Sequence, residues 1–158
     1  MNLVERHIIK KNHEFYDECD KLCFNSKNLY NSALYYIRQH YFETCKFLSY
    51  NKVYRYFRHK EVYTTLTDKI AKQTLRLLFS NIKSFFEAIK SYKKDSSKFK
   101  SYPKLTRYKD SDGRFTTQYD KESVSKPSLR KGYIKLSNSN IEFKTKKANI
   151  SNIRQVRI

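Results

Sequence analysis

The sequence predicts an α+β fold in which about three helices are inserted into a small β domain. Two long segments, residues 13–42 and 65–94, carry apolar residues at the helical period of 3.6 residues. A short run rich in β-branched residues precedes these helices, and several short alternating runs follow them. This order indicates that the first strand pairs with the later ones around the helical block.

The β domain is predicted to begin at the N-terminus, within residues 1–12. Val4 to Lys11 read VERHIIKK, which is short and β-branched, and Asn12 follows with turn and helix-cap character. We therefore expect a strand over residues 4–11 that ends at this cap.

The first predicted helix, within residues 13–42, has an apolar stripe beside a polar flank. The stripe includes Leu22, Leu29 and Ile37. Four polar residues at 25–28 interrupt the pattern, so the helix is expected to loosen there. The flank consists of Asn28, Asn31, Ser32, Tyr35, Arg38 and Gln39. Such side chains face either water or a ligand.

Two further helices complete the predicted helical domain, residues 13–95. The second opens at Ser49 or Asn51 and runs through Arg58 with an aromatic face. The third begins with a capping-box-like pair, Thr65 and Asp68. One edge of this third helix carries Lys69, Lys72, Gln73, Arg76, Lys83, Lys90 and Lys94. Such a stripe indicates either a polyanion-binding face or a solvated face.

Residues 96–158 are predicted to hold a linker and the remaining strands. Pro103 and the pair Asp112 and Gly113 mark turns. Short alternating runs follow at residues 114–119, 133–136, 141–145 and 153–158, and SNSN at 137–140 is hairpin-like. The last run stops without a polar tail, so we expect a chain truncated at its C-terminus, the front portion of something longer.

The charge balance favours a polyanionic partner. Thirty-four Lys and Arg face 15 Asp and Glu, a net charge of +19. A field of this size attracts phosphate backbones, so nucleic acid is the expected partner. The basic residues are spread along the chain rather than gathered on one amphipathic helix, which argues against a membrane surface. A 39% hydrophobic and 16% aromatic content is enough for a folded core.

Cysteine usage and the lack of targeting segments predict a cytoplasmic protein. Cys19, Cys23 and Cys45 form no CxxC pair, and the first two lie four apart on the apolar side of the first helix. Metal ligation with His40 or His59 is the alternative. No apolar run is long enough to span a membrane.

No catalytic constellation is recognisable, so we predict no catalytic residue, no metal and no cofactor. The acids are scattered, and several at the start of the first helix are explained as partners of its dipole. The four histidines lack a Ser or Cys partner in a nucleophile motif. Only two glycines are present, and no phosphate-binding loop appears.

Five segments together resemble the N-terminal part of the TnpB (OrfB) proteins of insertion sequences, RNA-guided DNA nucleases related to type V CRISPR effectors. These segments are distributed over the helical block and the β region, so the resemblance extends over essentially the whole chain. They are LCFNSKNLYNSALYYIRQ (22–39), DKIAKQTLRLLFSNIKSFFEAIK (68–90), YPKLTRYK (102–109), GYIKLSNSNIEFK (132–144) and ISNIRQVRI (150–158).

The resemblance implies a wedge-like β-barrel domain interrupted by a helical recognition domain. These parts would hold the guide RNA and its heteroduplex with the target, and would read a target-adjacent motif. Tyr50, Lys69 and Gln73 fall where family members contact that motif. A Gln amide pairs with an adenine edge, and Lys donates to guanine or thymine. Asp120 and Lys121 depart from the small polar pair expected nearby.

The family's RuvC-like nuclease and zinc ribbon would lie beyond this sequence, which leads to the first hypothesis. It is a truncated TnpB-like protein that binds structured guide RNA and duplex DNA without cutting. Its expected nucleic-acid-binding residues are Arg38, Tyr50, Lys69, Lys72, Gln73, Arg76, Lys83, Arg107, Lys109, Arg130 and Lys131. The alternatives are the first segment of a split or longer endonuclease, completed by a second polypeptide, and a decayed reading frame.

Overall fold

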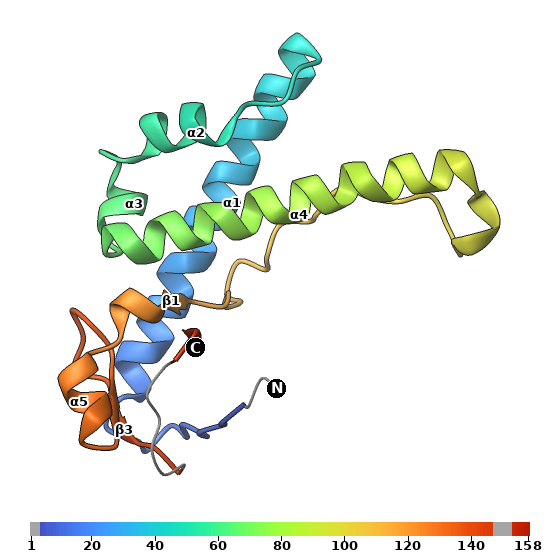
Figure 1. The fold of residues 1–158 in the computed structure, drawn as a ribbon. Coiled ribbons are helices and arrows are strands. Elements are labelled where there is room, and N and C mark those ends of the chain that lie inside the picture. Colours follow the sequence, from blue (N-terminus) through green and yellow to red (C-terminus); the bar gives the residue numbers. More distant parts are fainter. Residues whose placement is uncertain (1–3, 147–152) are drawn as a thin grey trace.

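The computed structural model describes residues 4–146 and 153–158 and shows a mixed α+β fold (Figure 1). The helices are α1 (Tyr16–Thr44), α2 (Tyr50–Phe57), α3 (Glu61–Thr64), α4 (Asp68–Lys94) and α5 (Lys126–Arg130). The strands are β1 (Gln118–Asp120), β2 (Tyr133–Lys135), β3 (Glu142–Lys144) and β4 (Gln155–Arg157). Two short 3-10 helices are η1 (Ser96–Lys98) and η2 (Lys121–Ser123).

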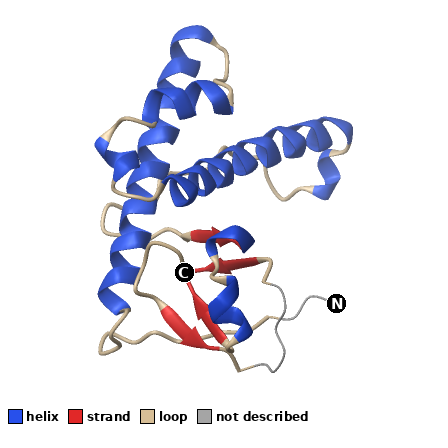
Figure 2. Ribbon diagram, turned by 60° about the vertical axis from the view of Figure 1, so that its left-hand side comes forward, coloured by secondary structure: helices blue, strands red, loops and turns tan. Residues whose placement is uncertain are grey.

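Helices α1 and α4 cross each other and form the main core (Figure 1). Their buried residues follow the apolar periods seen in the sequence, with Leu29 and Ile37 on α1 and Leu75 and Leu78 on α4. Beyond the crossing, α4 extends away from the rest of the chain, and the segment after η1 returns alongside it (Figures 1 and 2). The two long helices therefore form close to their predicted limits.

Helix α1 does not loosen at residues 25–28, contrary to expectation. Ser26 is buried and its hydroxyl shares a hydrogen bond of 2.9 Å with that of Thr117. The buried Lys27 amine donates to the backbone carbonyl of Ser111. Because the later part of the chain satisfies these polar groups, they do not interrupt the helix.

The start of α4 also differs from the predicted capping box. Thr67, not Thr65, occupies the N-cap position, and its side chain makes no capping hydrogen bond. The Asp68 carboxylate instead accepts hydrogen bonds of 2.7 Å from the Tyr63 hydroxyl and the Lys72 amine. Tyr63 belongs to α3, a single turn that the sequence did not predict.

The described strands form two separate antiparallel sheets of two strands each, and no closed barrel is present among them. β1 pairs with β4, whereas β2 pairs with β3 across the predicted SNSN turn. An isolated antiparallel bridge joins Val124, just after η2, to Leu136, just after β2. Each strand is only three residues long, and a barrel requires an unbroken ladder around the whole circuit. The expected barrel is therefore not confirmed.

The predicted first strand does not form. Residues 4–10 alternate in exposure as a strand would, yet they make no ladder. Side chains hold this segment beside β3: Glu5 accepts hydrogen bonds of 2.8 Å from the Thr145 hydroxyl and from the Lys146 backbone N–H, and the His7 ring lies 5.1 Å from that of Phe143. Residues 1–3 and 147–152, which fall in the predicted β segments, lie outside the described residues.

Acids at the start of α1 anchor the later part of the chain. Both carboxylate oxygens of Asp20 accept hydrogen bonds of 2.7 Å from the Arg114 guanidinium, whose hydrogen bonds are the main cause of the lowered pKa of Asp20. Glu18 accepts from the backbone N–H of Asn140. These residues, predicted as partners of the helix dipole, therefore also connect α1 to the segment after α4.

The cysteines are all reduced. Cys19 is buried and Cys23 is partly buried, as their spacing on the apolar side of α1 predicted. Burial raises the pKa of the Cys19 thiol to about 11, so this thiol is a neutral packing group.

None of the described helices combines the length and the apolar character that a membrane span requires.

Candidate nucleic-acid interface

The exposed face of α4 carries a row of basic side chains. Residues on this face recur three, four and seven positions apart, so they project in one direction, opposite the buried Thr74 and Leu78. Arg76, Lys83 and Lys90 are exposed, and Lys94 continues the row at the end of the helix. We name Lys69, Lys72, Gln73, Arg76, Lys83, Lys90 and Lys94 the α4 face.

Two acids of the β region contact the N-terminal end of the α4 face. The Lys69 amine lies 4.0 Å from a carboxylate oxygen of Glu122. The Gln73 amide nitrogen donates to Asp120 over 3.5 Å. Lys69 and Gln73 therefore lie side by side as predicted, but they face β1 and η2 of the same chain. A base edge at this position competes with these contacts.

Asp120 is held in place by more than its contact with Gln73. One carboxylate oxygen accepts from the backbone N–H and hydroxyl of Ser123 and from the backbone N–H of Glu122, at 2.8–3.1 Å. Burial alone would raise the pKa of Asp120, but the hydrogen bonds from Ser123 and Gln73 and the charge of Lys69 hold it below its ordinary value. Asp120 is therefore a charged cap for η2.

Tyr50, Lys72 and Arg76 come together where α2 packs against α4. Burial raises the pKa of Tyr50, and the nearby charges of Arg76 and Lys72 oppose that shift. The Lys72 amine lies 5.2 Å from the centre of the Tyr54 ring, and its hydrogen bond with Asp68 raises the pKa of Lys72. These three predicted residues thus form one local cluster.

Three predicted cations lie where residues 107–109 cross α1. The Asn31 side chain donates to the backbone carbonyl of Lys109 and accepts from its N–H, both at 2.8 Å. The Lys109 amine lies 5.2 Å from the centre of the Tyr30 ring, and the Arg38 guanidinium lies 5.2 Å from that of Tyr108. Arg107 is exposed beside them.

The remaining predicted residues lie apart from these groups. Arg130 and Lys131 are exposed at the end of α5. No ion pair or ring contact within the described residues joins them to the other predicted residues. Lys83 lies on the extended half of α4 and makes only an exposed pair with Glu87 at 3.8 Å. The structure therefore brings together two groups, one on α4 and one on α1.

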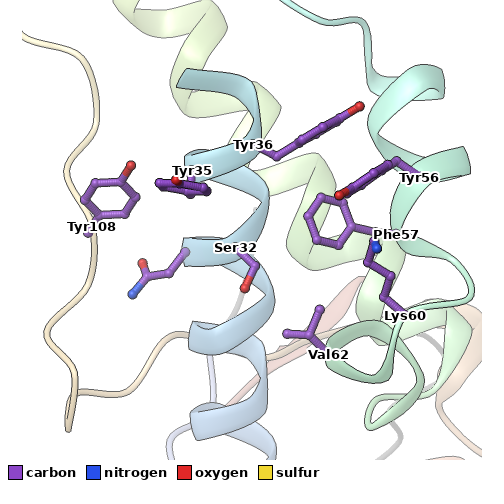
Figure 3. Close-up of a pocket in the computed structure, with 9 residues that line it drawn as sticks. Ser32, Tyr35, Tyr36, Tyr56, Phe57, Lys60, Val62 and Tyr108 are labelled. Carbon is purple, nitrogen blue, oxygen red and sulfur yellow. The ribbon is translucent and has the colours of Figure 1, made fainter. Parts of the chain in front are cut away.

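A shallow hollow of about 640 Å³ lies on the outward side of α1, between residue 108 and helices α2 and α3 (Figure 3). Tyr35 and Tyr108 lie on one side of α1, and Tyr36 and Tyr56 lie on the other. The Tyr36 and Tyr56 rings stack with centres 3.9 Å apart. We name this feature the α1 hollow; it is lined by Asn31, Ser32, Tyr35, Tyr36, Tyr56, Phe57, Lys60, Val62 and Tyr108.

Sequence reasoning misses most of the α1 hollow. It places Asn31, Ser32 and Tyr35 on the polar flank of the first helix. It assigns Tyr56, Lys60 and Tyr108 to no site. The triplet Arg107, Tyr108 and Lys109 carries a signal, because an aromatic residue between two cations is typical of nucleic-acid-binding surfaces. Tyr56 and Lys60 belong to the hollow through tertiary packing, which no local pattern reveals.

The described residues hold no recognisable metal centre. Within 4–146 and 153–158, no three His, Cys, Asp or Glu side chains are grouped closely enough to bind a metal ion.

Comparison of the chain with known protein families, curated proteins and solved structures found no match. The likeness to TnpB proteins therefore rests on the sequence segments alone.

Proposed function

We propose that this chain is the nucleic-acid-binding portion of a transposon-encoded TnpB-like protein, and that it binds guide RNA and target DNA without catalytic residues of its own. The observation that carries the proposal is the α4 face. Exposed cations extend along this helix of 27 residues. After Asp68, the helix contains one acid, Glu87. A helix face that only contacts water does not need such an excess of positive charge.

Two parts of the α4 face have different roles in this proposal. Arg76, Lys83 and Lys90 contact phosphates, because all three side chains are exposed. Lys69 and Gln73 lie nearest the β region and read base edges of the target-adjacent motif. The two small sheets correspond to the wedge-like β domain of the family, and Arg130 and Lys131 on α5 add contacts to the guide RNA.

A charge-removal experiment tests the phosphate contacts. The variant Arg76→Gln/Lys83→Gln/Lys90→Gln should lower the salt dependence of duplex binding by about 3 units of log affinity per log salt, since each lost phosphate contact accounts for about 0.9. The control, Lys10→Gln/Lys21→Gln/Lys46→Gln, removes the same charge from exposed positions elsewhere. Equal losses in the two variants would mean that only net charge matters, and would refute a role specific to α4.

A second experiment tests base reading. Replacing Lys69 and Gln73 together by Ala should reduce the preference for one or two base pairs by about 1–3 kcal/mol, as measured on a panel of duplexes with single-pair changes. Affinity for unrelated duplexes should stay nearly constant. If affinity instead falls by the same factor for every duplex, these residues do not read sequence.

A further inference from the structure

Three of the four tyrosines that line the α1 hollow are exposed to solvent. Tyr35 is 58% exposed, Tyr56 is 44% exposed and Tyr108 is 42% exposed. Rings in the core of this chain are far more buried, as Tyr30 and Tyr63 are. Aromatic rings collected on one surface mark a binding site more often than scattered exposed residues do.

Cations accompany these rings and no acid does. The Lys60 amine lies 4.4 Å from the centre of the Tyr56 ring, and the Arg38 guanidinium lies over Tyr108. None of the residues that line the hollow is acidic. Within the described residues, neither Lys60 nor Arg38 forms an ion pair. These features suit a ligand that carries negative charge and also presents flat apolar faces.

We propose that the α1 hollow binds unpaired nucleobases of a single-stranded nucleic acid. The bases stack on Tyr35 and Tyr108, and Arg38 and Lys60 contact the flanking phosphates. A duplex hides its base faces, so this site is distinct from the α4 face, which binds phosphates of a duplex. The inference rests on the proposed function, because it requires that the chain bind nucleic acid.

The polar groups of the hollow predict little base selectivity. The Asn31 amide is already bonded to the backbone of Lys109 through both its oxygen and its nitrogen. Stacking itself tolerates every base, because each base has an aromatic face. We therefore expect single strands of different sequence to bind with similar affinity.

A tryptophan reporter tests for ring stacking directly. The chain contains no Trp, so Tyr35→Trp provides a single emitting indole in the hollow. Its fluorescence should be quenched by single-stranded RNA and DNA 12-mers, but not by an abasic 12-mer with the same phosphates. The control Ile8→Trp places the reporter at an exposed position of the N-terminal segment, to which no nucleic-acid contact is assigned, and no quenching is expected there. If the abasic strand quenches the Tyr35→Trp variant to the same degree, the proposal is overturned.

Affinity measurements provide the second test. Tyr35→Ala/Tyr108→Ala should weaken single-strand binding about tenfold or more, within the range typical for loss of base stacking, whereas Tyr35→Phe/Tyr108→Phe should retain it. Duplex binding should be unchanged in both variants. If the Phe variant loses as much affinity as the Ala variant, or if neither loses any, stacking is refuted. Loss of a self-associated state in the Ala variant would identify the hollow as a protein interface and also overturn the proposal.

The two proposals fail separately. Suppose that the protein binds duplex normally, but that no quenching occurs and Tyr35→Ala/Tyr108→Ala has no effect. That result refutes the single-strand site and leaves the proposed function standing. A protein that binds neither single strands nor duplex at low salt refutes both proposals.

Discussion

Individual polar side chains of α1 hold the segment that follows α4. The Tyr30 hydroxyl lies 2.6 Å from that of Thr106 and accepts from the Asn81 amide at 3.1 Å. Asn31 binds the backbone of Lys109. Asn31 is therefore not free for water or a ligand, as its place on the helix flank suggested, but fixes the segment that carries Arg107 and Lys109.

Removing the Asn31 side chain should destabilise the protein. Asn31→Ala leaves the N–H and the carbonyl of Lys109 without their present partner, which costs about 1–3 kcal/mol when such groups are shielded from water. Urea denaturation followed by circular dichroism measures the loss. The control is Asn28→Ala, one turn earlier on α1, which should cost less than about 0.5 kcal/mol. Equal costs for the two variants would contradict the role of Asn31.

The depressed pKa of Asp120 predicts a specific loss of stability in acid. A carboxyl with a lower pKa in the folded state stabilises the fold above its unfolded pKa of about 3.9, and this contribution disappears as the pH falls through the folded pKa. Wild-type protein should therefore lose more stability between pH 7 and pH 2.5 than Asp120→Asn does. Glu87→Gln, in an exposed pair with Lys83, should behave as wild type. An unchanged pH profile in Asp120→Asn would contradict this.

Among the helices and strands, length decides what the sequence can predict. α1 and α4 are predictable because each repeats an apolar period over seven or more turns, which outweighs local polar residues. α3 and α5 were not predicted, because they have only 4 and 5 residues, too few to show the helical repeat of apolar residues. The predicted strand over residues 4–11 is wrong. Alternating apolar and polar residues indicate that one side of a segment is covered, but they do not show that a second strand is present to hydrogen-bond its backbone.

The candidate interface is predictable only within single helices. That Lys69 and Gln73 share a face follows from their spacing on α4. Their contacts with Glu122 and Asp120 join residues about 50 positions apart, so they depend on the packing of β1 and η2 against α4. The departure at Asp120 from the small residue that the family resemblance implied is visible in the sequence, but its contact is not.

Most of the hydrogen bonds that hold the N-terminal segment involve one carboxylate, and the Lys146 amine adds a bond of 3.1 Å to the backbone carbonyl of Arg6. Glu5 accepts from Thr145, from the Lys146 backbone and from the His7 ring at 2.5 Å. Because no strand ladder supplements these bonds in residues 4–10, Glu5→Ala should release the segment. Trypsin cleavage after Arg6 and Lys10 should then become several-fold faster. Cleavage after Arg130 at the end of α5 serves as the internal control, and equal acceleration there would indicate general unfolding.

Three acids of this protein are tied to neighbouring groups of the fold. Asp20 binds Arg114, Asp68 binds Tyr63 and Lys72, and Asp120 caps η2. On the extended half of α4, by contrast, the exposed Lys83, Lys90, Lys93 and Lys94 are accompanied by one acid, Glu87, which leaves an unbalanced positive charge there. A polyanion lying along α4 would neutralise that charge and release its own counterions.

The salt dependence of duplex binding by the wild-type chain is the most direct measurement of this interaction. Affinity for a 20-base-pair DNA, measured by fluorescence anisotropy between 50 and 300 mM salt, should fall with a slope of about −3 to −6 in log affinity against log salt, as expected for roughly three to seven phosphate contacts. A slope near zero, or no binding at 50 mM salt, would contradict a nucleic-acid-binding function.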